Sequence, residues 1–324
     1  MFRNLLFITL GLATAALPSF AQMSTAGLRG DVLDPSGNVI PKVNVAAINT
    51  ATRREFKTLT SGEGAYNLPF LPAGFYDVAF IAPGFSRQLI PGIKLEVGQV
   101  ARLDAHLEVG SVQQTVSVNG ESPLIQSSDA TVGTVVVESQ IRNLPLNGRK
   151  FLDLTLLVPG ANPSPGGSRQ QTLRGTFTSA INVNGSRETS NVYLMDGTLN
   201  HDVNYNTFVI SPNVDSIQEF RVETNNYSAE FGQQSGAQIN LVTKSGTNSL
   251  HGTLSEFLRN SALDAKNLFD RPQPASIPAF RQNQFGGTLG GPIRRDRTFF
   301  FSSYEGFRQV QAQTSIAIVP NAQV

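Results

Sequence analysis

Short alternations of apolar and polar residues, separated by turns, run through residues 26–108. Apolar residues recur at every second position in Val43/Val45, Tyr66/Leu68, Tyr76/Val78/Phe80 and Leu95/Val97. Between and around them lie the turn sequences Asp34-Pro35-Ser36-Gly37-Asn38, Ser61-Gly62-Glu63-Gly64, Pro72-Ala73-Gly74, Pro83-Gly84 and Pro91-Gly92. A period of two is typical of strands with one buried face, and glycine and proline end them. Short strands at this spacing predict a β-sandwich.

A different pattern follows in residues 124–246. Residues 139–157 mix helically spaced apolar positions with Pro145 and Asn147-Gly148, which predicts a short helix, a turn, and a second short helix beginning near Arg149. Ile181–Arg187 and Val192–Gly197 predict strands that end in tight turns. This mixture is that of an α+β domain.

Two stretches of this region, Asn162–Thr176 and Leu199–Pro212, are rich in Gly, Ser, Asn and Gln. Their composition predicts loops.

The stretch Asp215–Gly252 joins this region to a new kind of segment. Apolar residues alternate at Ile217, Phe220 and Val222, and again from Ile239 to Val242. After Asn248, three amphipathic segments follow, which are His251–Phe257, Gln284–Leu289 and Thr298–Phe307. The last is rich in aromatic residues, and aromatic residues at one end of an alternating strand are typical of transmembrane β-strands. The alternative is another soluble sheet.

The N-terminus has the features of a secretory signal peptide. Arg3 precedes the apolar run Leu5–Leu17, and Ser19-Phe20-Ala21 fits a cleavage site with small residues. The run is shorter than the roughly 20 residues that a spanning helix needs. We therefore expect residues 1–21 to be removed after Sec-type export; a membrane anchor or a buried helix is the alternative.

Composition excludes several classes of function. The chain of 324 residues has a formal net charge of +1, so it lacks the basic character of nucleic-acid-binding proteins. It contains no cysteine and three histidines far apart, His106, His201 and His251, which argues against a metal site. Asp196 lies near His201 and Asp202 in the sequence, but no further residue at a workable spacing completes a catalytic or metal-binding group. We expect no enzyme activity and no cofactor.

Several motifs in the first region resemble the carboxypeptidase regulatory-like domain. They are Gly64-Ala65-Tyr66, Leu71-Pro72-Ala73-Gly74-Phe75-Tyr76-Asp77-Val78 and Pro83-Gly84-Phe85. The resemblance implies a seven-stranded-type β-sandwich of a carbohydrate-binding-like fold over residues 22–108. It implies a binding or spacer module and brings no peptidase chemistry.

Later motifs resemble TonB-dependent outer-membrane receptors of the Oar-like group. They are Leu144-Pro145-Leu146-Asn147-Gly148-Arg149, Leu156–Gly160, Ile217–Phe220, Ala229–Gly232, Thr243–Asn248, His251-Gly252, Asn283–Gly287, Gly290–Pro292 and Phe299–Gly306. The resemblance implies a plug domain over residues 124–246 and the first strands of a transmembrane β-barrel over residues 247–324. The mainly β chain would lie in the outer membrane of a Gram-negative-type bacterium, in contact with its lipid.

The polar linker of residues 109–123 carries valines at period two. An exposed strip of this kind suits strand addition to a partner's sheet edge. By position it resembles the TonB box of the receptors, which implies contact with a TonB-type periplasmic energy-coupling protein. The candidate contact residues are Gln114, Thr115, Val116, Ser117 and Val118. A passive linker is the alternative.

In the receptors, plug loops touch the cargo. The resemblance therefore implies ligand-facing residues in the two predicted loops, although a solvated connection is the alternative. The candidates are Arg169, Arg174, His201, Asn204 and Tyr205.

Two functions follow as expectations. The first is the N-terminal portion of a transporter that imports or exports an unknown cargo by energy-coupled rearrangement of the plug. The residues after Asn248 are too few for a closed barrel, which needs about eight strands. We therefore expect a fragment, a truncated product or a partial reading frame. The second is a secreted or cell-surface β-sandwich protein that recognises a glycan or another surface polymer.

Overall fold

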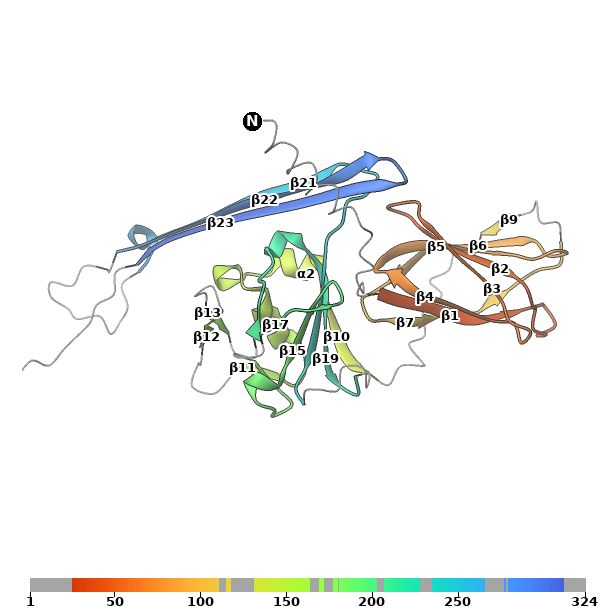
Figure 1. The fold of residues 1–324 in the computed structure, drawn as a ribbon, viewed down its shortest axis with the longest axis horizontal. Helices are drawn as coiled ribbons and strands as arrows, with labels where there is room; N and C mark the ends of the chain where they lie inside the picture. The colour runs from red at the N-terminus through yellow and green to blue at the C-terminus, as the bar shows by residue number, and fades with distance from the viewer. Residues whose placement is uncertain are drawn as a thin grey trace, which may run out of the picture.

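The computed structural model describes residues 25–110, 115–117, 131–163, 169–171, 177–179, 181–202, 207–227, 235–265, 277 and 279–311. Three parts follow one another along the chain (Figure 1). We call them the sandwich (25–110, with 115–117), the middle unit (131–243) and the strand sheet (251–311). The predicted signal peptide lies outside the described residues.

Two β-sheets form the sandwich. The first has the order β4-β1-β7, with β8 also paired to β1, and the second has the order β3-β2-β5-β6-β9. The strands are β1 (Thr25–Leu33), β2 (Asn44–Asn49), β3 (Glu55–Leu59), β4 (Ala65–Pro72), β5 (Gly74–Ile81), β6 (Arg87–Leu95), β7 (Val100–Arg102), β8 (Ala105–His106) and β9 (Thr115–Ser117). The predicted alternations fall in or beside β2, β4, β5 and β6, so the prediction of a β-sandwich is confirmed, whereas its seven-stranded type is not.

Strand β1 has the most regular burial pattern of the sandwich, and the alternations used for prediction did not include it. Every second residue from Ala26 to Val32 is buried. One of these positions is Gly30, where an added Cβ would lie 2.0 Å from the carbonyl oxygen of Leu103. Close approach of a neighbouring backbone therefore requires glycine, and a strand with Ala and Gly at inner positions has a weak apolar pattern.

The middle unit is built on a five-stranded sheet with the order β10-β19-β20-β15-β16, in which β15 and β20 are parallel. The strands are β10 (Val132–Val137), β15 (Val192–Met195), β16 (Thr198–Leu199), β19 (Ile217–Asn225) and β20 (Gln238–Thr243). Strands β14 (Ile181–Val183) and β15 confirm the predicted strand segments. Each ends in a turn with positive φ, at Asn184-Gly185 and at Asp196-Gly197.

The middle unit also contains short helices. They are α2 (Glu138–Asn143) and the 3₁₀ helices η1 (Asn147–Arg149), η2 (Phe151–Leu157), η4 (Glu188–Ser190) and η5 (Val214–Ser216). The predicted helix, turn and second helix are confirmed, although the second is a 3₁₀ helix. Phe151 of η2 packs edge-on against Phe220 of β19 at 5.9 Å between ring centroids, in the core of the middle unit.

The two predicted loops contain short strands, so that prediction was wrong in part. The first includes β11 (Ala161–Pro163) and β12 (Arg169–Gln171), which pair with β14 and with β13 (Phe177–Ser179). The second includes β17 (His201–Asp202) and β18 (Thr207–Phe208), which pair with each other. Backbone hydrogen bonds form these ladders, and they need no apolar periodicity in the sequence.

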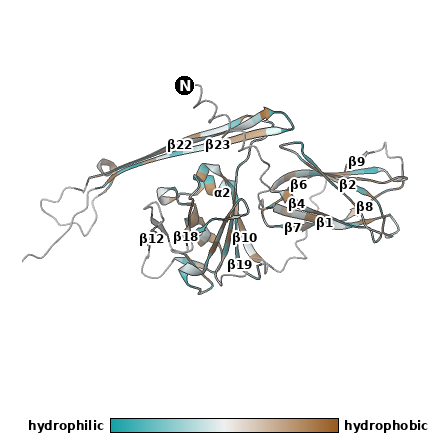
Figure 2. Ribbon diagram, viewed as in Figure 1, coloured by the Kyte–Doolittle hydropathy of each residue, from teal (hydrophilic) through white to brown (hydrophobic). Residues whose placement is uncertain are grey.

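The strand sheet is an antiparallel meander of β21 (His251–Asn260), β22 (Phe280–Arg294) and β23 (Thr298–Gln311), with the 3₁₀ helix η7 (Ser261–Leu263) after β21. All three strands extend beyond the predicted segments. Both hydrophobic and hydrophilic residues are spread along them (Figure 2). Ser255 and Glu305 both pair with Gly286, while Leu254 and Tyr304 both pair with Gly287. In this part of the sheet one face therefore carries Ser255 and Glu305, and the opposite face carries Leu254 and Tyr304. We call them the polar face and the apolar face.

Candidate functional site

The polar face of the strand sheet meets the middle unit around Arg149. The Oγ of Ser255 donates a hydrogen bond to Oδ2 of Asp215 at 2.9 Å. Asp215 lies in η5, where its backbone N–H donates to the side chain of Asn213. The amide nitrogen of the Asn213 side chain in turn donates to the carbonyl oxygen of Tyr304 at 3.4 Å. The start of β19 is thus tied to the strand sheet by side-chain hydrogen bonds.

Arg149 lies at the centre of this contact and ends η1 with φ 52°. A guanidinium nitrogen is 2.8 Å from Oδ2 of Asp215, and Nε is 3.8 Å from Oε2 of Glu305. The carbon of the guanidinium lies 4.4 Å from the ring centroid of Phe257. One buried cation therefore joins a carboxylate of its own unit to a carboxylate and an aromatic ring of the strand sheet. We call this group the Arg149 contact.

Burial makes the Arg149 contact more consequential than a surface ion pair. The side chains of Arg149 and Asp215 are 11% and 12% exposed. Exposed pairs contribute little because water screens them, whereas removal of one partner from a buried pair leaves a charge without compensation. The buried pair with Asp215 thus fixes the guanidinium in the position from which it also contacts Glu305 and Phe257 of the strand sheet.

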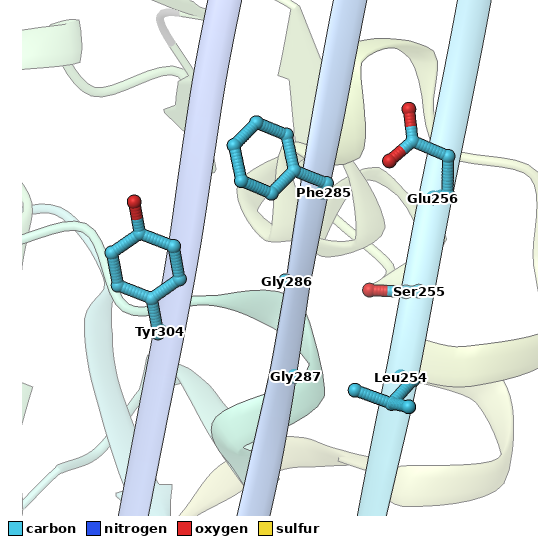
Figure 3. Close-up of a pocket in the computed structure, with 7 residues that line it drawn as sticks. All are labelled: Leu254, Ser255, Glu256, Phe285, Gly286, Gly287 and Tyr304. Carbon is cyan, nitrogen blue, oxygen red and sulfur yellow. The ribbon is translucent and has the colours of Figure 1, made fainter.

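Open hollows lie on both sides of the strand sheet. One of about 610 Å³ borders the Arg149 contact and is lined by residues of the α2–η1 segment together with Asp215 and Phe257. Another of about 550 Å³ lies over Gly287 of β22, with Leu254 of β21 on one side and Tyr304 of β23 on the other (Figure 3). The first is polar in part and the second is mainly apolar, in agreement with the two faces of the sheet.

The sandwich contacts the outer side of β19 through the turn that follows β6. Oε1 of Glu219 accepts a hydrogen bond from the backbone N–H of Val97 at 2.6 Å. Beside it, the side chain of Gln218 donates to the carbonyl oxygen of Ala73 at 3.3 Å. Glu219 is 5% exposed, and this burial raises the pKa of its carboxyl group above the ordinary value. A buried acid at the interface gives the contact a dependence on protonation.

Only part of the predicted partner-binding strip falls in the described residues. Thr115, Val116 and Ser117 form β9, which pairs in parallel with Arg87–Leu89 of β6. Gln114 and Val118 lie outside the described residues. The strip therefore forms the edge of its own domain's sheet, and its role in partner binding stays a prediction.

Of the predicted cargo-facing residues, Arg169 lies in β12 and His201 in β17, which belong to different two-stranded sheets. The imidazole ring of His201 stacks on Tyr193 at 6.3 Å between centroids. Arg174, Asn204 and Tyr205 lie outside the described residues. The cargo role of all five stays a prediction.

Asp196 has a structural role. Its carboxylate accepts hydrogen bonds from the backbone N–H and the hydroxyl of Thr243, both at 2.8 Å. These bonds join the ends of β15 and β20. Among the described residues no group of three or more His, Cys, Asp or Glu is placed to hold a metal ion. In the same part of the chain, no helix has the length and apolar character to span a membrane.

The Arg149 contact was not predicted as a site. Arg149 is the last residue of the motif Leu144–Arg149, and Asp215, Ser255 and Glu305 are distant from it in sequence. The motif and the polar positions of β21 and β23 were the only signals. Only the three-dimensional fold shows that residues so far apart in the sequence contact one another.

Two family models match the chain. The carboxypeptidase regulatory-like domain matches residues 27–108, and the outer membrane beta barrel domain matches residues 242–324. The chain is also similar to the TonB-dependent transporter Oar of Myxococcus xanthus, with 27% identity over 303 residues. This alignment covers 88% of the chain and 27% of the length of that relative.

Likenesses to solved structures are weak. Catechol 1,2-dioxygenase from Acinetobacter sp. ADP1 gives a TM-score of 0.23 at 12% identity, with 32% of this chain and 60% of that chain covered. The Bacillus anthracis TIE protein also gives 0.23 at 12% identity, with 92% and 47% covered. Neither likeness carries a functional argument. The sequence comparisons confirm the resemblance to Oar-like TonB-dependent transporters, with a carboxypeptidase regulatory-like domain at residues 27–108 and an outer-membrane β-barrel domain at residues 242–324.

Proposed function

We propose that the chain is the front part of an energy-coupled outer-membrane transporter. The middle unit is its plug domain, and the strand sheet forms part of the barrel wall. The observation that carries this proposal is the Arg149 contact, through which the middle unit packs on the polar face of strands whose other face is apolar. A barrel that encloses a plug has this arrangement, because its lumen is polar and its outer surface meets lipid.

The domain limits that go with this proposal are 22–108 for the sandwich, 109–123 for the linker, 124–246 for the plug and 247–324 for the barrel strands. The chain acts without a cofactor and is not an enzyme. Its location is the outer membrane, reached after export through the Sec system. The cargo is unnamed, and either import or export is compatible with the geometry.

In this account, a TonB-type periplasmic protein pairs with the strip 114–118 and pulls on the chain. The force reaches the middle unit along the chain that connects the strip to β10. Ordered rearrangement requires that the Arg149 contact break while the barrel wall stays in place. The contacts across the boundary are few: Arg149 lies 3.8 Å from Glu305 and over the ring of Phe257, and two side-chain hydrogen bonds lie beside it. They can therefore break together while the Arg149–Asp215 pair stays intact within the middle unit.

The test is binding of the chain to the periplasmic domain of a TonB-type protein, with Val116→Pro as the variant. Proline cannot donate a ladder hydrogen bond, so strand addition at the strip is lost. Glu121→Pro, which lies in the same linker outside the strip, is the control. We expect binding by the parent chain and the control and none by V116P. Equal binding by V116P and the control would refute strand addition at this strip.

A further inference from the structure

Two turns rich in arginine lie side by side at one end of the strand sheet. One connects β2 to β3 in the sandwich, and the other connects β22 to β23 (Figure 1). Asn248 joins them, because its backbone N–H donates to the carbonyl oxygen of Ala51 at 3.0 Å. Its side chain donates to Oδ1 of Asp296 at 2.8 Å and accepts from the backbone N–H of Asp296 at 2.9 Å.

Five exposed arginines lie in these turns or directly beside them: Arg53, Arg54, Arg294, Arg295 and Arg297. We call them the rim cluster. The chain as a whole has a formal net charge of only +1, so this concentration does not follow from a generally basic composition. The carboxylate within the β22–β23 turn, that of Asp296, is hydrogen-bonded to Asn248. Glu55, which follows the first turn, forms an ion pair with Lys57 at 2.8 Å.

Exposed apolar residues next to the rim cluster continue the apolar face of the strand sheet. Leu250 and Ile293 are 72% and 71% exposed. Further along the sheet, Leu254 and Leu289 on the same face are 95% and 49% exposed. This arrangement suits a membrane surface. The apolar side chains would contact the acyl chains, and the arginines would lie at the level of the anionic headgroups.

We propose that the rim cluster binds the anionic headgroups of lipids in the membrane leaflet around this end of the strand sheet. The inference rests on the proposed function, since that places the apolar face of the sheet in lipid. It gives the sandwich a role, because the Asn248 junction brings two of the five arginines from the sandwich to the membrane surface. Each arginine near an anionic surface strengthens binding by on the order of fivefold.

The experiment is flotation of the mature chain, residues 22–324, with vesicles of phosphatidylcholine, with and without phosphatidylglycerol, after dilution from detergent. Two variants remove two charges each, R53Q/R54Q in the sandwich and R294Q/R295Q in the strand sheet. The control R281Q/R308Q removes two exposed arginines from the opposite end of the same sheet. Circular dichroism checks that each variant is folded. If R294Q/R295Q does not fold, R53Q/R54Q alone is compared with the control.

The parent chain is expected to bind both kinds of vesicle, and at least tenfold more tightly when phosphatidylglycerol is present. Each rim variant loses most of this preference, whereas the control keeps it. Equal binding to both vesicles would refute the lipid assignment while leaving the membrane placement intact. Loss of the preference in the control as much as in the rim variants would show general charge attraction and also refute it. Binding to neither vesicle would overturn the membrane placement and with it this inference.

Discussion

Removing the charge of Arg149 tests the strength of the contact between the middle unit and the strand sheet. In Arg149→Met the carboxylates of Asp215 and Glu305 lose their shared cation, and Phe257 loses the guanidinium 4.4 Å from its ring. Loss of one partner of a buried ion pair costs about 3–5 kcal/mol. The side chains of Arg149 and Asp215 are 11% and 12% exposed, so solvent screening reduces this value only slightly.

Amide hydrogen exchange of η5 and β19 measures the opening of this contact. A loss of about 3 kcal/mol corresponds to roughly a hundredfold faster exchange. The matched control is Arg142→Met, because the side chain of Arg142 is 53% exposed and pairs with Glu138 only at 3.5 Å. We expect less than a threefold change in the control. If R149M exchanged as slowly as R142M, the Arg149 contact would not hold the two parts together.

Three further results are expected. Burial raises the pKa of Glu219 in the folded state, so the contact between the sandwich and β19 is strongest at low pH and weakens as the pH rises through the raised pKa. Hydrogen exchange of the Val97 amide, measured against pH, should show this weakening, and Glu219→Gln should abolish the pH dependence. Asp196→Ala removes both acceptors for Thr243 and should cost about 1–3 kcal/mol in denaturant unfolding, whereas a change under 0.5 kcal/mol would contradict the role given to Asp196. Gly30→Ala places a methyl group 2.0 Å from the carbonyl oxygen of Leu103 and should lower the melting temperature of the sandwich. An unchanged melting curve would show that this close approach does not require glycine.

The sequence predicts the sandwich well where local chemistry decides the structure. Strands such as β5 place Tyr76, Val78 and Phe80 in the core at period two, and the turns around them contain Gly and Pro. Strand β1 escaped prediction because contact with the neighbouring backbone, rather than apolar side chains, determines residues such as Gly30. Short ladders such as β17–β18 escaped for a related reason, since backbone pairing leaves no periodic signal.

The candidate site was less predictable than the fold. The alternation in β21 and β23 predicts which residues share a face, but it does not say what packs on that face. The partners of Arg149 come from η5 and from β23, more than sixty and one hundred and fifty residues away. Such pairs depend on how the middle unit packs against the strand sheet, and a single sequence does not show this packing.

Thiol cross-linking tests whether the middle unit packs on the polar face of the strand sheet. The chain has no cysteine, so Ser255→Cys with Asn213→Cys introduces the only two thiols and leaves the charges of Arg149, Asp215 and Glu305 in place. Ser255 pairs with Gly286, and a Cβ added at Gly286 would lie 3.4 Å from the side chain of Asn213, so the two thiols are close together. The control pairs Asn213→Cys with Ser302→Cys, since Ser302 pairs with Leu289 on the apolar face. If the middle unit packs on the polar face, a short thiol cross-linker joins the first pair in membranes and spares the second. Equal cross-linking of both pairs, or cross-linking of the control alone, would contradict the account.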